Sequence, residues 1–257
     1  MSGGHSPSHA LYRPGSSVVH RLPPQCKLAA VLVFVLVVVA TPKEQFWAFG
    51  VYALLLAGVA LVARVPFPVV AKRMVVEVPF VLFAVLLPFL APGNTVQVLG
   101  LELSESGLLD AWNILAKGTL GVVASILLAA TTEPRALLIG VERLHLPGLM
   151  VQIMSFMLRY VDVVGGEMNR MRIARESRGF QGRDVRHLKV VAQSAGALFI
   201  RSYERGERVH LAMLSRGYNG TMPVVHDLRA DRAQWATAAA LPLAALVVTA
   251  AAWTVTS

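Results

Sequence analysis

Long apolar runs constrain this chain more than any other feature of its sequence. They cover residues 28–41, 46–63, 74–91, 107–131 and 235–253. A helix needs about 20 apolar residues to cross a bilayer, with a usable range of about 17–25. Four runs meet that length, and the shorter first run is also compatible with a re-entrant segment. Only 15% of the residues are charged, against about 25% in soluble domains, so we expect an all-α membrane protein.

The basic residues between these runs predict an orientation. Segment 64–73 carries three Lys or Arg, and segment 132–234 carries 16 against 10 Asp or Glu, whereas segment 92–106 has no Lys or Arg. Because cytoplasmic loops are enriched in Lys and Arg, the two basic segments are predicted to lie inside and the third outside. The N-terminal segment is also basic, so two crossings must precede 64–73. This gives about five spans, with the N-terminus inside and the C-terminus outside.

The same patterns divide the chain into four parts. The first part is rich in Gly, Ser and Pro, which is typical of disorder, and its His5 and His9 are better explained as solvated side chains than as metal ligands. We expect a disordered cytoplasmic tail over 1–27, four transmembrane helices over 28–131, a cytoplasmic region of amphipathic helices over 132–234 and a transmembrane helix over 235–257.

Three ionisable residues, Glu77, Asp110 and Lys117, lie within the predicted spans. Such residues suggest a functional site by default, because a charge inside a bilayer is costly. Asp110 and Lys117 are two helical turns apart, so they share a face and could find partners on neighbouring helices. The alternative is structural: Glu77 and Asp110 lie near span ends, and Lys117 can extend its ammonium group toward the interface.

The predicted cytoplasmic region contains two candidate helices. The first follows Pro147 and carries apolar side chains spaced alternately by four and three residues, which is a heptad seam. Methionine suits surfaces that repack against more than one arrangement, so the seam predicts either ordinary packing or an exchangeable contact with a partner. The second helix is predicted from about Leu188 to Leu214. The seam consists of Met150, Met154, Met157, Val161, Val164, Met168 and Met171.

A nine-residue frame occurs twice in this region, as "ARESRGFQG" at 174–182 and "AMLSRGYNG" at 212–220. Gly179 and Gly217 fit the position just after a helix, where the chain turns into a left-handed conformation. Arg178 and Arg216 then lie at the helix end, where a cation is favourable. Ordinary helix caps would explain either copy alone. Because a guanidinium binds carboxylates as a planar fork, the recurrence favours two projecting arginines for two equivalent acidic grooves on a partner.

Motifs that carry catalytic chemistry are missing from the sequence. It contains no G-x-x-x-x-G-K-[ST], H-E-x-x-H or G-x-S-x-G and no cluster of Cys and His, with Cys26 as its single cysteine. The formal net charge of +9 is explained by cytoplasmic loops rather than by nucleic-acid binding. We therefore expect a non-enzymatic membrane protein.

The five-span layout with its helical insert resembles the transmembrane T component of energy-coupling factor transporters. Within that family, "MRIARESRGF" and "LFIRSYERGERVHLAMLSRGYNG" are similar to the cobalt-type member, CbiQ. The resemblance covers nearly the whole chain after the tail and is tightest over 167–220. The two motifs of the family commonly read Ala-Arg-Gly, and here Ser177 and Ser215 stand in place of alanine.

The resemblance implies a place in a bacterial cytoplasmic membrane, as a multi-pass subunit of a complex. Its partners would be two cytoplasmic CbiO-like ATPase subunits, a substrate-binding CbiM-like membrane subunit, a small CbiN-like membrane subunit and lipid. Arg178 and Arg216 would anchor the ATPase subunits, and the seam would pass their motion to the substrate-binding subunit. ATP and the metal ion would be handled by those partners, so no cofactor is expected in this chain.

Two alternatives to a cobalt-type T component stay open at this stage. One is a T component that serves nickel or a vitamin, since substrate choice would lie in another subunit. The other is a self-sufficient secondary transporter. Such transporters usually contain internal repeats of their spans, which this sequence does not show, and the cytoplasmic region would then have no purpose.

Overall fold

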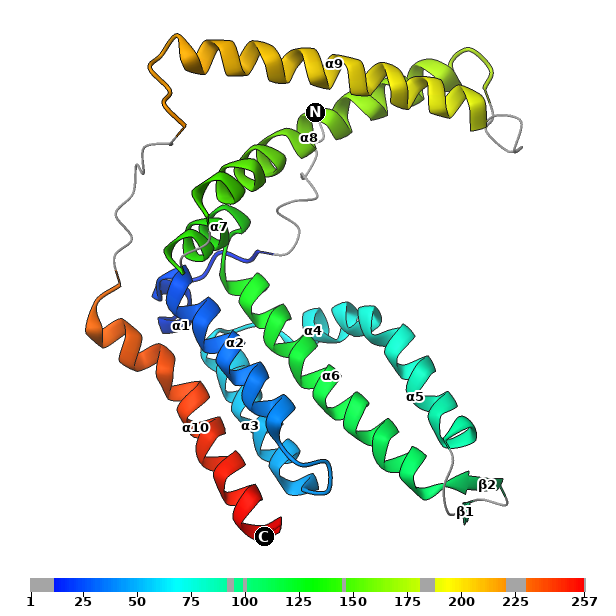
Figure 1. Cartoon of the computed structure of the whole chain (residues 1–257), viewed down its shortest axis with the longest axis vertical. Helices are drawn as coiled ribbons and strands as arrows, with labels where there is room; N and C mark the ends of the chain where they lie inside the picture. Colours follow the sequence, from blue (N-terminus) through cyan, green and yellow to red (C-terminus); the bar gives the residue numbers. More distant parts are fainter. Residues whose placement is uncertain are drawn as a thin grey trace. The chain divides into compact units, whose positions relative to one another are not determined.

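The fold was analysed in a computed structural model that describes residues 12–91, 95–98, 101–144, 147–180, 188–220 and 230–256. Helices dominate these residues (Figure 1), which confirms the expected all-α class. The structure also contains a small antiparallel hairpin that was not predicted, in the segment predicted to lie outside. It consists of β1 (Thr95–Val98) and β2 (Leu101–Ser104). The chain forms two compact units, Leu11–Leu144 with Leu228–Ser257 and Met1–Ala10 with His145–Asp227.

The larger unit contains the predicted transmembrane helices. By length and hydropathy, the stretch Phe67–Leu90, α6 (Glu105–Thr131) and α10 (Arg232–Thr256) can each cross a membrane, whereas α2 (Pro24–Ala40) and α3 (Phe46–Val62) are shorter apolar helices. The run 46–63, which was predicted to be long enough to cross, thus forms a helix of the same length as that of the first run, 17 residues each. The elements of this unit are α1 (Val18–Arg21), α2 (Pro24–Ala40), α3 (Phe46–Val62), α4 (Phe67–Arg73), the 3₁₀ helix η2 (Met74–Glu77), α5 (Val78–Leu90), α6 (Glu105–Thr131), α7 (Pro134–Arg143) and α10 (Arg232–Thr256).

The core of the larger unit lies where α2, α3, α6 and α10 meet. The hydroxyl of Tyr52 on α3 lies 2.9 Å from Thr41 Oγ1 at the end of α2 and 2.8 Å from Thr249 Oγ1 on α10. Tyr52 is fully buried, so these bonds satisfy a polar group that apolar surroundings would otherwise penalise. The face of α10 that packs inward carries alanine at 238, 245 and 252. Such small side chains let membrane helices approach closely.

The three ionisable residues within the spans all have partners inside this unit. Lys43 Nζ donates to Asp110 Oδ1 at 2.7 Å, and this hydrogen bond, together with the carboxylate charge, raises the pKa of Lys43. Lys117 Nζ donates to a backbone carbonyl of α2 at 2.8 Å. The buried carboxylate of Glu77 accepts a hydrogen bond from the hydroxyl of Thr119. These contacts favour the structural alternative over a functional site.

The structure differs from the sequence prediction in the segment 12–27, which packs on the larger unit rather than forming a separate tail. Arg13 N–H donates to the carbonyl of Ala130 at 3.0 Å, and Lys27 Nζ donates to that of Thr131 at 2.9 Å. Both carbonyls belong to the last turn of α6. Because the last carbonyls of a helix have no partner within it, this segment supplies donors that they need.

The helix α7 also joins the larger unit, although its residues fall within the region predicted as cytoplasmic. A Cβ on Gly140 would lie 2.9 Å from backbone and side-chain atoms at the start of α2. The bare Cα therefore permits the close approach of the two helices. His5 and His9 lie outside the described residues.

Candidate functional site

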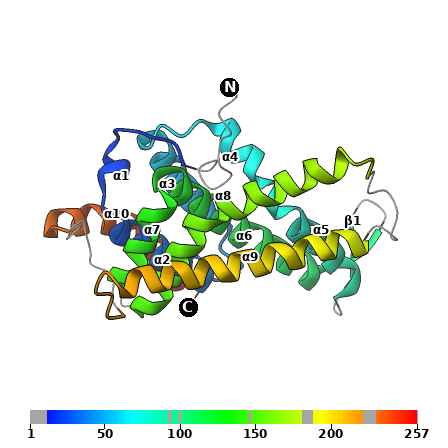
Figure 2. The ribbon, with the colours of Figure 1, turned by 90° about the horizontal axis from the view of Figure 1, so that it is seen from above.

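Two long helices form the smaller unit, α8 (Gly148–Glu176) and α9 (Leu188–Leu214). Their bounds confirm the two helices predicted after Pro147 and from about Leu188 to Leu214. The helices are inclined to each other in both views (Figures 1 and 2), so they cross rather than lie parallel along their lengths. By length and hydropathy alone α8 is also apolar enough to span a membrane, but it carries Arg159, Asp162 and Glu167 in its middle.

An ion cluster lies where the two helices cross. Glu167 of α8 accepts hydrogen bonds from Arg201 at 3.3 Å and Arg205 at 3.2 Å, both on α9. The Glu167 side chain is only 13% exposed. A carboxylate at this depth is stabilised by two charged donors, because an unpaired buried charge would be costly. Beside the cluster, Phe156 and Tyr160 of α8 line a groove of about 240 Å³ against α9.

The methionine seam lies partly on this contact face. Met157 and Val164 line the groove. Met150, Met157 and Val161 are at least half exposed. Met154, Met168 and Met171 are half-buried. The aromatic pair Phe156 and Tyr160 therefore shares the groove against α9 with two residues of the seam. The seam remains a predicted contact surface for a partner.

Both helices end in the same hydrogen-bonded cap, defined here as residues 173–180 on α8 and 211–218 on α9. In the first, Gly179 N–H donates to the carbonyl three residues earlier at 3.0 Å, and Phe180 N–H donates five residues back at 3.1 Å. Gly217 and Tyr218 repeat both bonds, each at 3.0 Å. The two glycines have φ of +84° and +83°. This is the Schellman motif, and it confirms the predicted placement of both glycines.

The polar side chains of the two caps also follow one pattern. The hydroxyl of Ser177 donates to the carbonyl of Ala174, and that of Ser215 donates to the carbonyl of Ala212, each at 3.0 Å. Arg178 and Arg216 are exposed, and neither forms an ion pair with any residue in the described part of the chain. The caps thus present two free guanidinium groups on helix ends of fixed shape.

The support behind the two caps differs, and the sequence alone did not predict it. In the first cap the guanidinium of Arg175 lies 5.9 Å from the centre of the Phe180 ring. In the second, the Tyr218 hydroxyl exchanges hydrogen bonds of 2.6 and 2.8 Å with the side-chain amide of Gln152, at the start of α8. Gln181 and Gly182, which complete the first copy of the frame, lie outside the described residues.

This arrangement suits recognition rather than catalysis. In the described ranges, no three His, Cys, Asp or Glu side chains gather as ligands for a metal ion. Two guanidinium forks on rigid helix ends can each bind a carboxylate through two parallel hydrogen bonds. The predicted Ser-Arg-Gly residues therefore lie where a partner protein could reach them.

Comparison with known proteins places these features in a wider group. The family model described as "Cobalt transport protein", CbiQ, matches residues 15–226. The energy-coupling factor transporter transmembrane protein EcfT of Bacillus selenitireducens is 31% identical over 223 residues, which cover 81% of this chain and 82% of that protein. EcfT of Bacillus subtilis is 29% identical over 224 residues (81% and 83%), and EcfT of Listeria innocua is 30% identical over 226 residues (81% and 83%).

Proposed function

Since this chain belongs to the CbiQ family and is the transmembrane T component of an energy-coupling factor transporter, we propose that it couples two ATPase subunits to a separate substrate-binding membrane subunit. The T component is a non-catalytic, multi-pass membrane subunit. In this proposal ATP and the transported ion are handled by the partner subunits, and this chain transmits motion between them. CbiO-like ATPases, a CbiM-like substrate-binding subunit and a small CbiN-like subunit are the proposed partners.

The observation that carries the proposal is the pair of matching caps. Each delivers one exposed arginine on a Schellman-capped helix end, with the same backbone hydrogen bonds. A pair of equivalent projections is what a partner with two equivalent subunits requires. We assign Arg178 and Arg216 as the anchors, each seated in an acidic groove of one ATPase subunit, with Ser177, Gly179, Ser215 and Gly217 shaping the helix ends.

The exposed seam supports the second half of the proposal. Closure of the ATPase pair would move α8 and α9, and the seam would carry that motion to the substrate-binding subunit. Met157, with 65% of its surface exposed, lies at the centre of this surface. Met157→Glu should therefore leave the ATPase subunits bound while transport falls at least tenfold. Failure of this variant to accumulate in the membrane would instead make the seam part of the chain's own core.

Cobalt is the substrate we propose for the complete transporter. Support comes from the description of the matching family model as a cobalt transport protein, while the EcfT relatives carry no substrate in their names. Uptake of labelled cobalt, nickel and vitamins by cells that express the whole operon would compare the candidates. Uptake of a vitamin without uptake of cobalt would overturn the assignment.

Co-purification tests the coupling role directly. A tagged chain, extracted from its own host in mild detergent, should bring down two ATPase subunits and a membrane subunit in fixed ratio, and uptake should require ATP. A secondary transporter would instead purify alone and drive uptake from an ion gradient. The second outcome would end the coupling proposal.

A further inference from the structure

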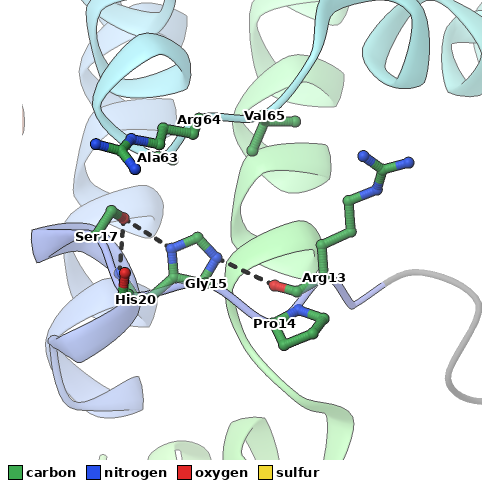
Figure 3. Close-up of a pocket in the computed structure, with 9 residues that line it drawn as sticks. Arg13, Pro14, Gly15, Ser17, His20, Ala63, Arg64 and Val65 are labelled. Atoms are coloured by element: carbon green, nitrogen blue, oxygen red, sulfur yellow. Dashed lines mark hydrogen bonds between the residues drawn. The ribbon is translucent and has the colours of Figure 1, made fainter.

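A basic cavity lies at the end of α3, in the larger unit. It has a volume of about 300 Å³ and is walled by residues 13–17, by His20 of α1 and by residues 63–65. Figure 3 shows the guanidinium groups of Arg13 and Arg64 on either side of the His20 imidazole. No acidic residue lines the cavity. Within the residues that the structure describes, neither arginine forms an ion pair.

The backbone at Arg64 shows that an arginine at this position has a cost. α3 ends in a cap like those of α8 and α9: Arg64 N–H donates to the carbonyl of Leu61, and Val65 N–H donates to that of Ala60, each at 3.0 Å. The position that glycine occupies in the other two caps is taken here by Arg64, with φ of +53°. It is the one non-glycine residue with a positive φ in the described part of the chain. A left-handed conformation disfavours any side chain, and such strain often marks functional positions.

Hydrogen bonds fix the residues that line the cavity between the two arginines. His20 Nε2 lies 3.1 Å from the carbonyl of Arg13, and His20 Nδ1 lies 2.7 Å from the hydroxyl of Ser17. Because a carbonyl only accepts, Nε2 carries the proton, and the hydroxyl donates to Nδ1 in the neutral ring. A Cβ on Gly15 would come within 2.6–2.9 Å of the ring atoms. The imidazole therefore packs directly on the backbone of Gly15 and fixes the backbone conformation of residues 13–17.

The chemistry of this cavity matches a phosphate group. Guanidinium forks bind phosphate oxygens in pairs, and the imidazole and the hydroxyl of Ser16 add no negative charge. The cavity also lies at a predicted membrane edge, since α3 is an apolar helix that ends at Val62. Exposed apolar side chains stand three residues before and three residues after Arg64, with Leu61 78% and Phe67 79% exposed. A ligand with a phosphate at one end and acyl chains at the other would satisfy both surroundings.

We propose that Arg13 and Arg64, with the clasp formed by His20, Ser17 and Gly15, bind the phosphodiester headgroup of an anionic phospholipid. The segment 64–73 is predicted to face the cytoplasm, so the lipid belongs to the inner leaflet. Basic pockets between membrane helices on that side are suited to anionic headgroups. The site is independent of the two caps and of the coupling role.

The test is native mass spectrometry of the full chain in detergent, titrated with phosphatidylglycerol and, separately, with phosphatidylcholine. The unmodified chain should bind the first lipid at least tenfold more tightly. Arg13→Ala and Arg64→Gly should each weaken phosphatidylglycerol binding about tenfold, because each removes a charged hydrogen-bonding partner. Arg21→Ala is the matched control: it removes an equal charge from a neighbouring exposed position that does not line the cavity, and it should change binding less than twofold.

Arg64→Gly separates binding from folding. Glycine accepts a positive φ without strain, so this variant should unfold at the same temperature as the unmodified chain or higher, while it loses the lipid. Loss of thermal stability together with lipid binding would make Arg64 a structural residue and overturn the proposal. An equal loss in Arg21→Ala would reduce the effect to general surface charge and overturn it as well.

Two further arms test the ligand itself. Equal binding of both lipids would rule out recognition of net negative charge. Displacement of phosphatidylglycerol by millimolar inorganic phosphate would identify a site for a free anion instead of a lipid. Gly15→Ala, which keeps every charge but collides with the imidazole, should weaken binding severalfold; unchanged binding would remove the clasp from the site.

Discussion

The ends of α8 and α9 have the same backbone but different support. Both close with the same pair of backbone hydrogen bonds, both place glycine at φ near +84°, and both expose an arginine. Behind them the surroundings diverge: Arg175 and Phe180 belong to one helix end, whereas Tyr218 is bonded to Gln152 on the other helix. Only the part that a partner can touch is repeated. The first cap supports itself, and the second is braced against the start of α8.

The largest effect should come from removing the repeated arginines. Truncating one partner of a buried, hydrogen-bonded charge pair costs about 2–5 kcal/mol, or about 30-fold to several thousand-fold in affinity. Arg178→Ala or Arg216→Ala should each weaken capture of the ATPase subunits by that factor, and the double variant should abolish it. Lysine should restore little, because an ammonium group lacks the planar fork.

Matched controls exist on the same helices. Arg172 and Arg208 are exposed and form only i,i+4 pairs, with Glu176 and Glu204. Such pairs contribute about 0–1 kcal/mol, so Arg172→Ala and Arg208→Ala should leave capture nearly unchanged. Normal recovery of both ATPase subunits by the double Arg178→Ala, Arg216→Ala variant would refute the anchor assignment.

The next effect tests whether the two caps are equivalent in backbone terms. Nothing lies within 4 Å of a Cβ built on Gly179 or Gly217, so alanine there meets strain alone, about 1–2 kcal/mol. Gly179→Ala and Gly217→Ala should each raise amide hydrogen exchange at their own helix end about five- to thirtyfold. Effects that differ by more than tenfold between the caps would break the equivalence.

A smaller effect should separate the two caps. Tyr218→Phe removes the hydrogen bonds to Gln152 and should cost about 0.5–1.5 kcal/mol, with faster exchange at the second cap only. A double-mutant cycle with Gln152→Leu, measured by thermal unfolding, should give a coupling energy of about 1 kcal/mol. Additive losses in that cycle would show that the hydrogen bonds between Tyr218 and Gln152 contribute no coupling energy.

Phe180→Leu, which removes the contact with Arg175, should loosen only the first cap, by about 0.5–1 kcal/mol.

The smallest effect concerns the serines that open each motif. Each hydroxyl donates to an exposed carbonyl one turn earlier, and exposed substitutions usually change stability by less than about 0.5 kcal/mol. Ser177→Ala and Ser215→Ala should therefore alter uptake by about twofold or less. A tenfold loss in either variant would mean that the hydroxyl itself contacts a partner.

Much of this architecture could be predicted from local sequence rules. Hydrophobic run length predicted the membrane helices, the seam period predicted α8, and the Gly-terminated frames predicted both caps. The contacts between helices could not be predicted in this way. α8 carries both a methionine seam and the aromatic pair Phe156 and Tyr160. Members of both line the groove against α9, which the spacing along one helix did not show.

Two features of the sites left no signal that a local rule could read. The bond between Tyr218 and Gln152 joins residues 66 apart, so it depends on where two helices cross. The left-handed Arg64 follows an apolar run with no glycine at its end, and the usual marker of such a cap was therefore missing. The first is a consequence of tertiary packing, which a propensity describes only weakly.

The bond between Gln152 and Tyr218 also has a consequence for how such proteins can be recombined. The segment between these residues begins and ends at two bonded side chains, so its ends lie close together as those of an inserted domain do, and such segments tolerate exchange. A chimera that replaces residues 153–217 with the corresponding helices of another T component, and keeps both bonding residues, should still fold. The chimera would then bind the ATPase subunits of the protein that supplied residues 153–217, whichever protein supplied the membrane helices.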